Sequence, residues 1–250
     1  MAIVLRRLDY SETSLVLAVF TRDHGQQRLI AKGVKRSTKN RASIGIDLLE
    51  RGRVTFSARP GKESTLSPLT EWRQDEHYPH LRGDLGRWYS AQYAAEVTAG
   101  MTEPGDPHAD LFDALDGFLV SLDEPGPVAS LISYLWKLLV EIGLRPEMER
   151  CTSCARRVET DEVVHFSSRS GGVVCRDCEP GVVEKRRVSR RVVQALRSAG
   201  PAPREDAAIE AFELLDYHFT ELMHRPPRLS APLRAAIGAA KGPASKAPRH

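Results

Sequence analysis

Short apolar runs separated by turn signals make up the first 75 residues. The runs AIVL, SLVLAVF, QQRLIA, DLLERGRVTFS and STLSPLTEW follow one another at the spacing of a small all-β barrel. The tetrapeptide RDHG at 22–25 is typical of a hairpin turn, because Gly25 can take a positive φ. We therefore expect residues 1–75 to form a β-barrel.

The fourth of these runs carries a second pattern. Apolar Val54 and Phe56 alternate with polar residues, so a period of two buries one face of the strand and exposes the other. The exposed face is then lined by three arginines: Arg51, Arg53 and Arg59. We expect this arginine row to form part of a basic surface.

After Trp72, apolar residues recur three and four positions apart, which is typical of amphipathic helices. Segments that contain Pro and Gly, such as TEPGDPH and DEPGP, separate the first three helices. We predict five helices in one helical domain, over residues 89–101, 109–122, 128–144, 189–198 and 205–224. Residues 241–250 are small, basic and contain proline, and we expect a disordered tail.

The composition bounds the class of protein. With 250 residues, of which 41% are hydrophobic and 28% charged, the chain is ordinary for a soluble globular protein. No apolar run approaches the roughly 18 residues of a membrane span, and strand-like AIVLRRLDY follows Met1 in place of a signal peptide. We expect a cytoplasmic, reducing setting and no membrane partner.

Charge is separated along the chain. The net charge is +3, but residues 1–75 carry +6, residues 76–150 carry −8 and residues 151–250 carry +5. The stretch AKGVKRSTKNR has no acid and concentrates five cations: Lys32, Lys35, Arg36, Lys39 and Arg41. Most such runs are only solvated loops, but beside the arginine row this one can track a phosphate backbone. We expect mainly electrostatic binding that does not depend on nucleic-acid sequence.

The four cysteines form the most specific motif. The C-x2-C pairs CTSC and CRDC comprise Cys151 with Cys154 and Cys175 with Cys178, and twenty residues separate them. Each pair can aim two sulfurs at one point, and four thiolates match the tetrahedral preference of Zn²⁺. We predict one structural zinc in a ribbon whose hairpin is formed by VVHF and GGVVC. Four thiolates leave no position for a catalytic water.

Other interpretations of these features are weaker. Two disulfides would require an oxidising compartment, and a thioredoxin-like pair would need a surrounding βαβ pattern that the sequence lacks. No P-loop, G-x-S-x-G or H-E-x-x-H motif occurs, which argues against an ATP-driven motor or a hydrolase. A zinc-ribbon factor of transcription or translation and a metal-dependent enzyme remain open at this point.

Several separated stretches resemble the RecO family of bacterial DNA repair proteins. They are VLRRLDYSETSLVLAVFTRDHG, AKGVKR, LWKLLVEIGLRPEMERCTSC and HFTELMHRPPRLS, and they follow the family's order over nearly the whole chain. Ala31, Lys32 and Gly33, with Lys35 and Arg36, resemble the family's basic loop. The chain departs from the family at ASIGIDLLE, where a Leu-x-Pro-Phe-like strand entry is usual.

The resemblance implies an α+β multidomain protein. An N-terminal OB-fold at 1–75 is followed by a helical domain at 76–148 and 184–240, with a four-cysteine zinc ribbon inserted at 149–183. It also implies a non-enzymatic recombination mediator without a catalytic centre, which binds single- and double-stranded DNA and anneals complementary strands.

The resemblance implies protein partners as well. RecR, and often RecF, work with the family to load RecA onto strands coated by single-strand binding protein, in the bacterial cytoplasm at the nucleoid. The acidic C-terminal tail of that coat protein would meet a basic rim, for which the candidates are Arg145, Arg150, Arg156, Arg157 and the run at 184–191. An outer helix surface that is merely solvated explains Arg190 and Arg191 equally well.

Overall fold

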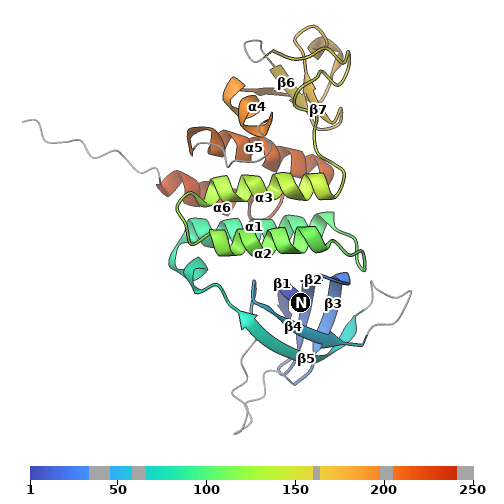
Figure 1. Cartoon of the computed structure of the whole chain (residues 1–250), viewed down its shortest axis with the longest axis vertical. Coiled ribbons are helices and arrows are strands. Elements are labelled where there is room, and N and C mark those ends of the chain that lie inside the picture. The colour runs from blue at the N-terminus through green and yellow to red at the C-terminus, as the bar shows by residue number, and fades with distance from the viewer. Residues whose placement is uncertain (34–45, 58–65, 160–163, 198–204, 241–250) are drawn as a thin grey trace, which may run out of the picture.

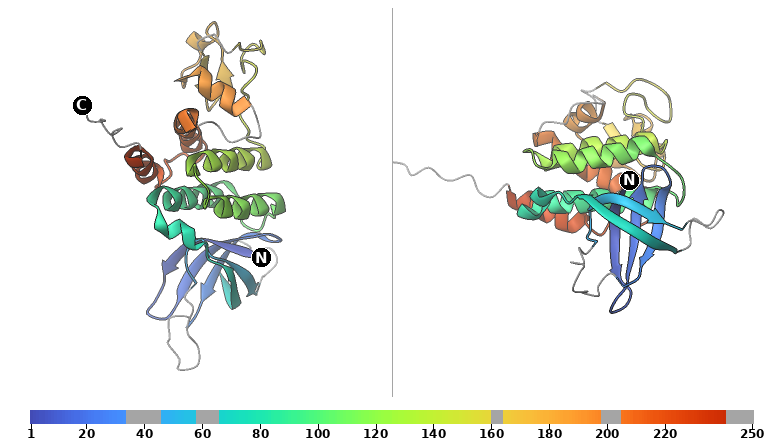
Figure 2. Two further views of the ribbon diagram at one scale, coloured as in Figure 1. Left: turned by 60° about the vertical axis from the view of Figure 1, so that its left-hand side comes forward. Right: turned by 60° about the horizontal axis from the view of Figure 1, so that its bottom comes forward.

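The computed structural model describes residues 1–33, 46–57, 66–159, 164–197 and 205–240. Three parts follow one another along the long axis of the molecule: a β-barrel at one end, a helical layer in the middle and a small cysteine-containing module at the other end (Figure 1). The views in Figure 2 show the same separation of barrel and module. The tail predicted at 241–250 lies outside the described residues.

Five strands form the barrel, as the sequence predicts: β1 (Ala2–Asp9), β2 (Leu15–Thr21), β3 (Gly25–Ala31), β4 (Arg51–Phe56) and β5 (Ser67–Glu76). They close in the order β1-β2-β3-β5-β4, an OB-like arrangement in which only the β3–β5 pair is parallel. Inward-facing side chains fill the interior: Ala2, Val4, Leu15, Leu17, Val19, Leu29, Ala31 and Ile46. The barrel therefore has a core of its own.

Six helices lie in the described residues: α1 (Leu85–Met101), α2 (Ala109–Ser121), α3 (Pro127–Glu141), α4 (Arg190–Arg197), α5 (Glu205–Leu222) and α6 (Ser230–Ala240). A short 3-10 turn, η1 (Pro79–Gly83), links β5 to α1. The prediction of five helices missed α6. This helix begins after the proline pair at 226–227 and packs against α1. None of the described helices has the length and apolar character needed to cross a bilayer.

The cysteine module contains a three-stranded sheet in the order β7-β6-β8, formed by β6 (Val164–Ser167), β7 (Gly172–Val174) and β8 (Arg186–Val188). The predicted hairpin is confirmed as the antiparallel pair β6–β7. The sequence did not predict β8, which lies within the basic run at 184–191. Phe166 and Val173 of this sheet belong to the same hydrophobic core as the helices, so the module shares the core of the helical layer.

Polar contacts also fix the module on α4 and α5. Arg197 of α4 donates hydrogen bonds of 2.7 Å and 2.6 Å to the carbonyls of Met148 and Val158. The buried ring of His218 in α5 lies 2.6 Å from the hydroxyl oxygen of Ser168, and burial lowers the pKa of His218 to about 4. The imidazole is therefore neutral at the junction, where a charge would have to be buried.

The barrel docks on the helical layer through the outer face of β1 and β2. Phe20 belongs to the helical core, with its ring centroid 6.2 Å from that of Phe112 in α2. The β2–β3 turn meets the α1–α2 connection so closely that a Cβ on Gly25, which has φ +60, would lie 2.1 Å from the carbonyl oxygen of Asp106. Only glycine fits this contact, both for space and for its backbone conformation.

Replacing Gly25 should loosen this docking. Gly25→Ala places a methyl group against the Asp106 carbonyl, and we expect the free energy of unfolding, measured by urea denaturation, to fall by at least about 2 kcal/mol. Gly33→Ala is the matched control, because Gly33 has φ +72 but no atom within 4 Å of its Cβ position. The control should cost about 1 kcal/mol. Equal losses in both variants would contradict a tight contact at Gly25.

Candidate metal centre and nucleic-acid interface

The four cysteines meet at one point, although they come from two loops. Cys151 and Cys154 lie between α3 and β6, and Cys175 and Cys178 lie between β7 and the 3-10 turn η2 (Glu179–Gly181). All four Sγ atoms lie within 4.8 Å of one another, and those of Cys154 and Cys175 are 3.9 Å apart. A tetrahedral metal with bonds of ~2.3 Å to sulfur needs sulfur–sulfur distances of ~3.8 Å. The cluster therefore fits one metal ion.

Backbone hydrogen bonds shape each cysteine pair into a tight turn. The N–H of Ala155, which has φ +60, donates to the Cys151 carbonyl at 2.8 Å. In the second pair, the N–H of Glu179 donates to the Cys175 carbonyl at 3.0 Å. A bond of 2.9 Å from the N–H of Thr152 to the carbonyl of Val173 joins the first turn to β7. The two turns thereby aim their sulfurs at a common point.

The surroundings of the cluster favour the deprotonation of one cysteine and oppose that of another. Burial raises the pKa of Cys151, but N–H groups of Cys175, Cys154 and Ser153 hydrogen-bond to its sulfur and lower the pKa to about 6. Hydrogen bonds to Cys175 and Cys154 raise the pKa of Cys178 to about 12. Four thiolates at this point therefore require a cation. The four cysteines are free. The 3.9 Å between the Sγ atoms of Cys154 and Cys175 exceeds the ~2.05 Å of a disulfide bond.

Most of the residues predicted to bind DNA cannot be compared with the structure. Five of them lie outside the described residues: Lys35, Arg36, Lys39, Arg41 and Arg59. Lys32 is described, and it follows β3 directly and is exposed. Arg51 and Arg53 lie in β4, where the predicted arginine row can be examined.

Arg51 lies at the end of the predicted row nearest the helices. It pairs with Ile3 of β1, which packs on the helical layer, so Arg51 shares the outer face of β4 with Arg53 but lies beside the helices. The Arg51 guanidinium forms an ion pair with the carboxylate of Asp116 in α2, which also accepts a hydrogen bond from the hydroxyl of Tyr78. Arg51 therefore joins the barrel to the helices, and its part in DNA binding stays a prediction, although its charge is already paired with an acid of this chain.

Arg53 is exposed on the outer face of β4 and β5, but this β4–β5 face is not strongly basic. Directly opposite is Arg73, which the sequence analysis missed. The Arg53 side chain lies 3.7 Å from the carboxylate of Asp75, and Glu71 lies opposite Thr55 on the same face. In the described part of these two strands, two arginines and two acids leave the face close to neutral, so it offers little to a phosphate chain.

An unpredicted basic face lies on β1, β2 and β3. Arg6 of β1 pairs across to Ala18 of β2, and Ala18 pairs with Arg28 of β3, so the three side chains share the outer face. Arg6, Arg28 and the nearby Lys32 are exposed, and no ion-pair partner for them occurs among the described residues. Unpaired cations on a sheet face are suited to phosphate groups. This β1–β3 face is the candidate nucleic-acid interface.

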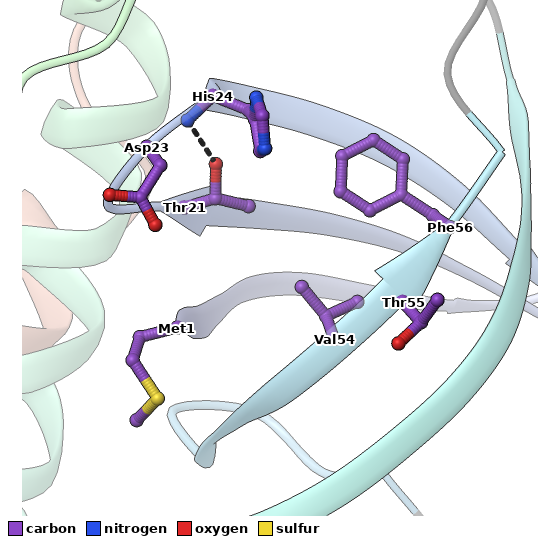
Figure 3. Close-up of a pocket in the computed structure, with 7 residues that line it drawn as sticks. All are labelled: Met1, Thr21, Asp23, His24, Val54, Thr55 and Phe56. Atoms are coloured by element: carbon purple, nitrogen blue, oxygen red, sulfur yellow. Dashed lines mark hydrogen bonds between the residues drawn. The ribbon is translucent and has the colours of Figure 1, made fainter.

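A small cavity of about 250 Å³ lies between the β2–β3 turn and β4 (Figure 3). It is lined by Met1, Thr21, Asp23, His24, Val54, Thr55 and Phe56. A hydrogen bond of 3.0 Å from the N–H of His24 to Thr21 Oγ1 holds the turn. The lining includes the carboxylate of Asp23 and neither lysine nor arginine, so the cavity is not suited to phosphate.

The basic rim predicted to bind an acidic tail is partly occupied by acids of this chain. Arg156 lies 3.2 Å from Asp177, and Arg186 lies 3.9 Å from Glu213. The two arginines at 190–191 are exposed in the first turn of α4. Binding of a tail by this rim stays a prediction.

Comparison with known proteins gives consistent matches over most of the chain. The family model described as recombination protein O N terminal matches residues 1–74, and the one described as recombination protein O C terminal matches residues 82–231. A protein named DNA repair protein RecO from Rhodopirellula baltica is 34% identical over 205 residues, which cover 81% of this chain and 75% of the relative.

Two further relatives carry the same printed name. The one from Desulfitobacterium hafniense is 32% identical over 178 residues, which cover 71% of this chain and 63% of the relative. The one from Moorella thermoacetica is 33% identical over 176 residues, which cover 70% of this chain and 64% of the relative. The matched region therefore spans slightly less than two thirds of the length of these two proteins.

Removing one thiolate tests the metal centre. Cys151→Ser should release the metal, because three thiolates remain, and should loosen the module while the barrel keeps its separate core. Metal analysis of the purified protein measures the loss directly. Ser153→Ala lies in the same turn and keeps its backbone N–H, so this control should retain the ion. A Cys151→Ser chain that still holds one metal ion per molecule would show that the four-cysteine assignment is wrong.

Proposed function

Because this chain belongs to the RecO family of DNA repair proteins, we propose that it is a recombination mediator that binds single- and double-stranded DNA and anneals complementary strands. The observation that carries the proposal is the β1–β3 face, with exposed Arg6, Arg28 and Lys32. The sequence adds four more cations within nine residues after Lys32: Lys35, Arg36, Lys39 and Arg41. All seven cations would supply positive charge to a phosphate chain.

Annealing follows from charge neutralisation. Two complementary strands repel each other through their phosphates, and cations on the protein lower this repulsion. Contacts to phosphates carry no sequence information and leave the base edges free to pair. The process needs no nucleotide hydrolysis, in agreement with a sequence that has no P-loop, and we propose a non-enzymatic role.

We further propose that the metal is a single structural Zn²⁺. A donor set made only of thiolates favours zinc over hard cations such as Mg²⁺ or Ca²⁺, and the sulfur separations fit its tetrahedral radius. A bound zinc ion would cross-link the two cysteine turns and contribute folding free energy. Cys151, Cys154, Cys175 and Cys178 would fill all four positions, which supports a structural role.

The partners and domain limits that the family implies complete the proposal. RecR, and often RecF, would act with this protein to load RecA, and the acidic tail of single-strand binding protein would bring it to coated strands in the bacterial cytoplasm. The barrel at 1–75, the helical domain at 76–148 with 184–240 and the insert at 149–183 would be its domains. The core that the module shares with the helices supports its description as an insert.

The proposal predicts annealing of complementary strands coated with single-strand binding protein, without ATP. Fluorescence energy transfer between labelled strands measures it. Removing the acidic tail of the coat protein should abolish this annealing, because the tail is the proposed point of attachment, while bare strands should still anneal. Moderate salt should weaken annealing of coated strands first. A requirement for ATP, or equal annealing with and without the tail, would refute the mediator role.

A further inference from the structure

One row of apolar side chains crosses four strands on the outside of the barrel. Leu8 of β1 pairs with Val16 of β2, Val16 pairs with Ile30 of β3, and Ile30 pairs with Pro68 of β5. Directly paired residues point to the same side of a sheet, so the four side chains are continuous. With strands ~4.8 Å apart, the row is about 14 Å long.

This row is open to solvent, unlike the apolar residues closer to the helices. Leu8 is 46% exposed, and Val16 and Ile30 are half-buried. Tyr10, just beyond the end of β1, is 67% exposed. By contrast, Phe20, on the same outer side of β2, is fully buried against the helical layer. A run of exposed aliphatic and aromatic side chains on one sheet face is typical of a binding surface.

Cations lie on both sides of the row. Arg6 and Arg28 form the neighbouring row on the side toward the helices, and Lys32 follows Ile30 by two residues on the other side. Successive rows on one face of a sheet are only ~6.7 Å apart. Apolar side chains between positive charges are complementary to a single strand that turns its bases to the protein and keeps its phosphates at the edges.

From this juxtaposition we propose that Leu8, Val16, Ile30 and Tyr10 contact the faces of unpaired nucleobases and make the β1–β3 face selective for single strands. The inference rests on the proposed DNA binding and adds a base contact to it. In a duplex the base faces are stacked inside, and only phosphates and groove edges are accessible. The apolar row therefore contributes to single-strand affinity alone, whereas the flanking arginines contribute to both.

Salt titration separates the two kinds of contact. The slope of log K against log salt concentration counts phosphate contacts, and the affinity extrapolated to about 1 M salt reports contacts that release no counterions. Leu8→Thr with Ile30→Thr should leave the slope for an oligo-dT strand unchanged and lower the extrapolated affinity about tenfold. Affinity for a duplex of the same length should change less than about twofold. Threonine is β-branched, and strands favour such residues.

Two control sets accompany this variant. Val120→Thr with Val140→Thr replaces two exposed valines on α2 and α3, away from the barrel, and should bind like the wild type. Tyr10→Phe should also bind like the wild type, whereas Tyr10→Ala should weaken single-strand binding, because the ring face makes the contact. Unchanged circular dichroism spectra would establish that each variant is folded.

The outcomes distinguish this inference from the proposed function. A wild-type chain that binds neither DNA form would overturn both. A wild-type chain that binds both forms, with row variants that weaken both equally or neither, would overturn the base contact alone. Row variants that keep full DNA affinity but lose binding to RecR would assign the surface to a protein partner, which would also overturn the inference.

Discussion

The contact between the barrel and α2 decides which barrel surfaces are free. Arg22 and Arg51 pair with Asp113 and Asp116, which lie one turn apart on α2. Two of the acids in the negatively charged middle of the chain therefore bind arginines of the barrel. These pairs and the packing of the helices cover the half of the β1–β2 outer face nearest the helical layer. The other half, which begins at Arg6, stays open and carries cations without acidic partners among the described residues.

The cysteine module packs on the helices at one side and carries its cysteine cluster at the other. Phe166 lies in the shared core, whereas Cys154 is exposed and Cys178 is half-buried at the turns. A metal would therefore stabilise the turns more than the sheet. The module and the barrel lie at opposite ends of the molecule (Figure 2), so the metal site is far from the β1–β3 face.

The barrel, five of the helices and the metal cluster could be predicted because each follows from a local pattern. Surface charge could not, because it depends on residues far apart in the sequence. Arg51 shares the outer face of β4 with Arg53, yet it lies beside the helical layer and pairs with Asp116, 65 residues away. Arg28 is exposed because it points to the opposite side of β3 from its buried neighbour Leu29. The sequence analysis treated this segment only as an apolar run and did not consider Arg28. The apolar row across four strands could likewise not be predicted, because sequence alone does not align side chains of different strands.

The central claim is that DNA phosphates contact the β1–β3 face and not the β4–β5 face. Two double variants remove equal charge from the barrel: Arg6→Ala with Arg28→Ala, and Arg53→Ala with Arg73→Ala. The direct test is the salt dependence of single-strand binding. With ~0.7 per phosphate contact, the first variant should lower the log–log slope by about 1.4 and the second should leave it unchanged. A slope that falls only with the second variant would place the DNA on the other face and contradict the account.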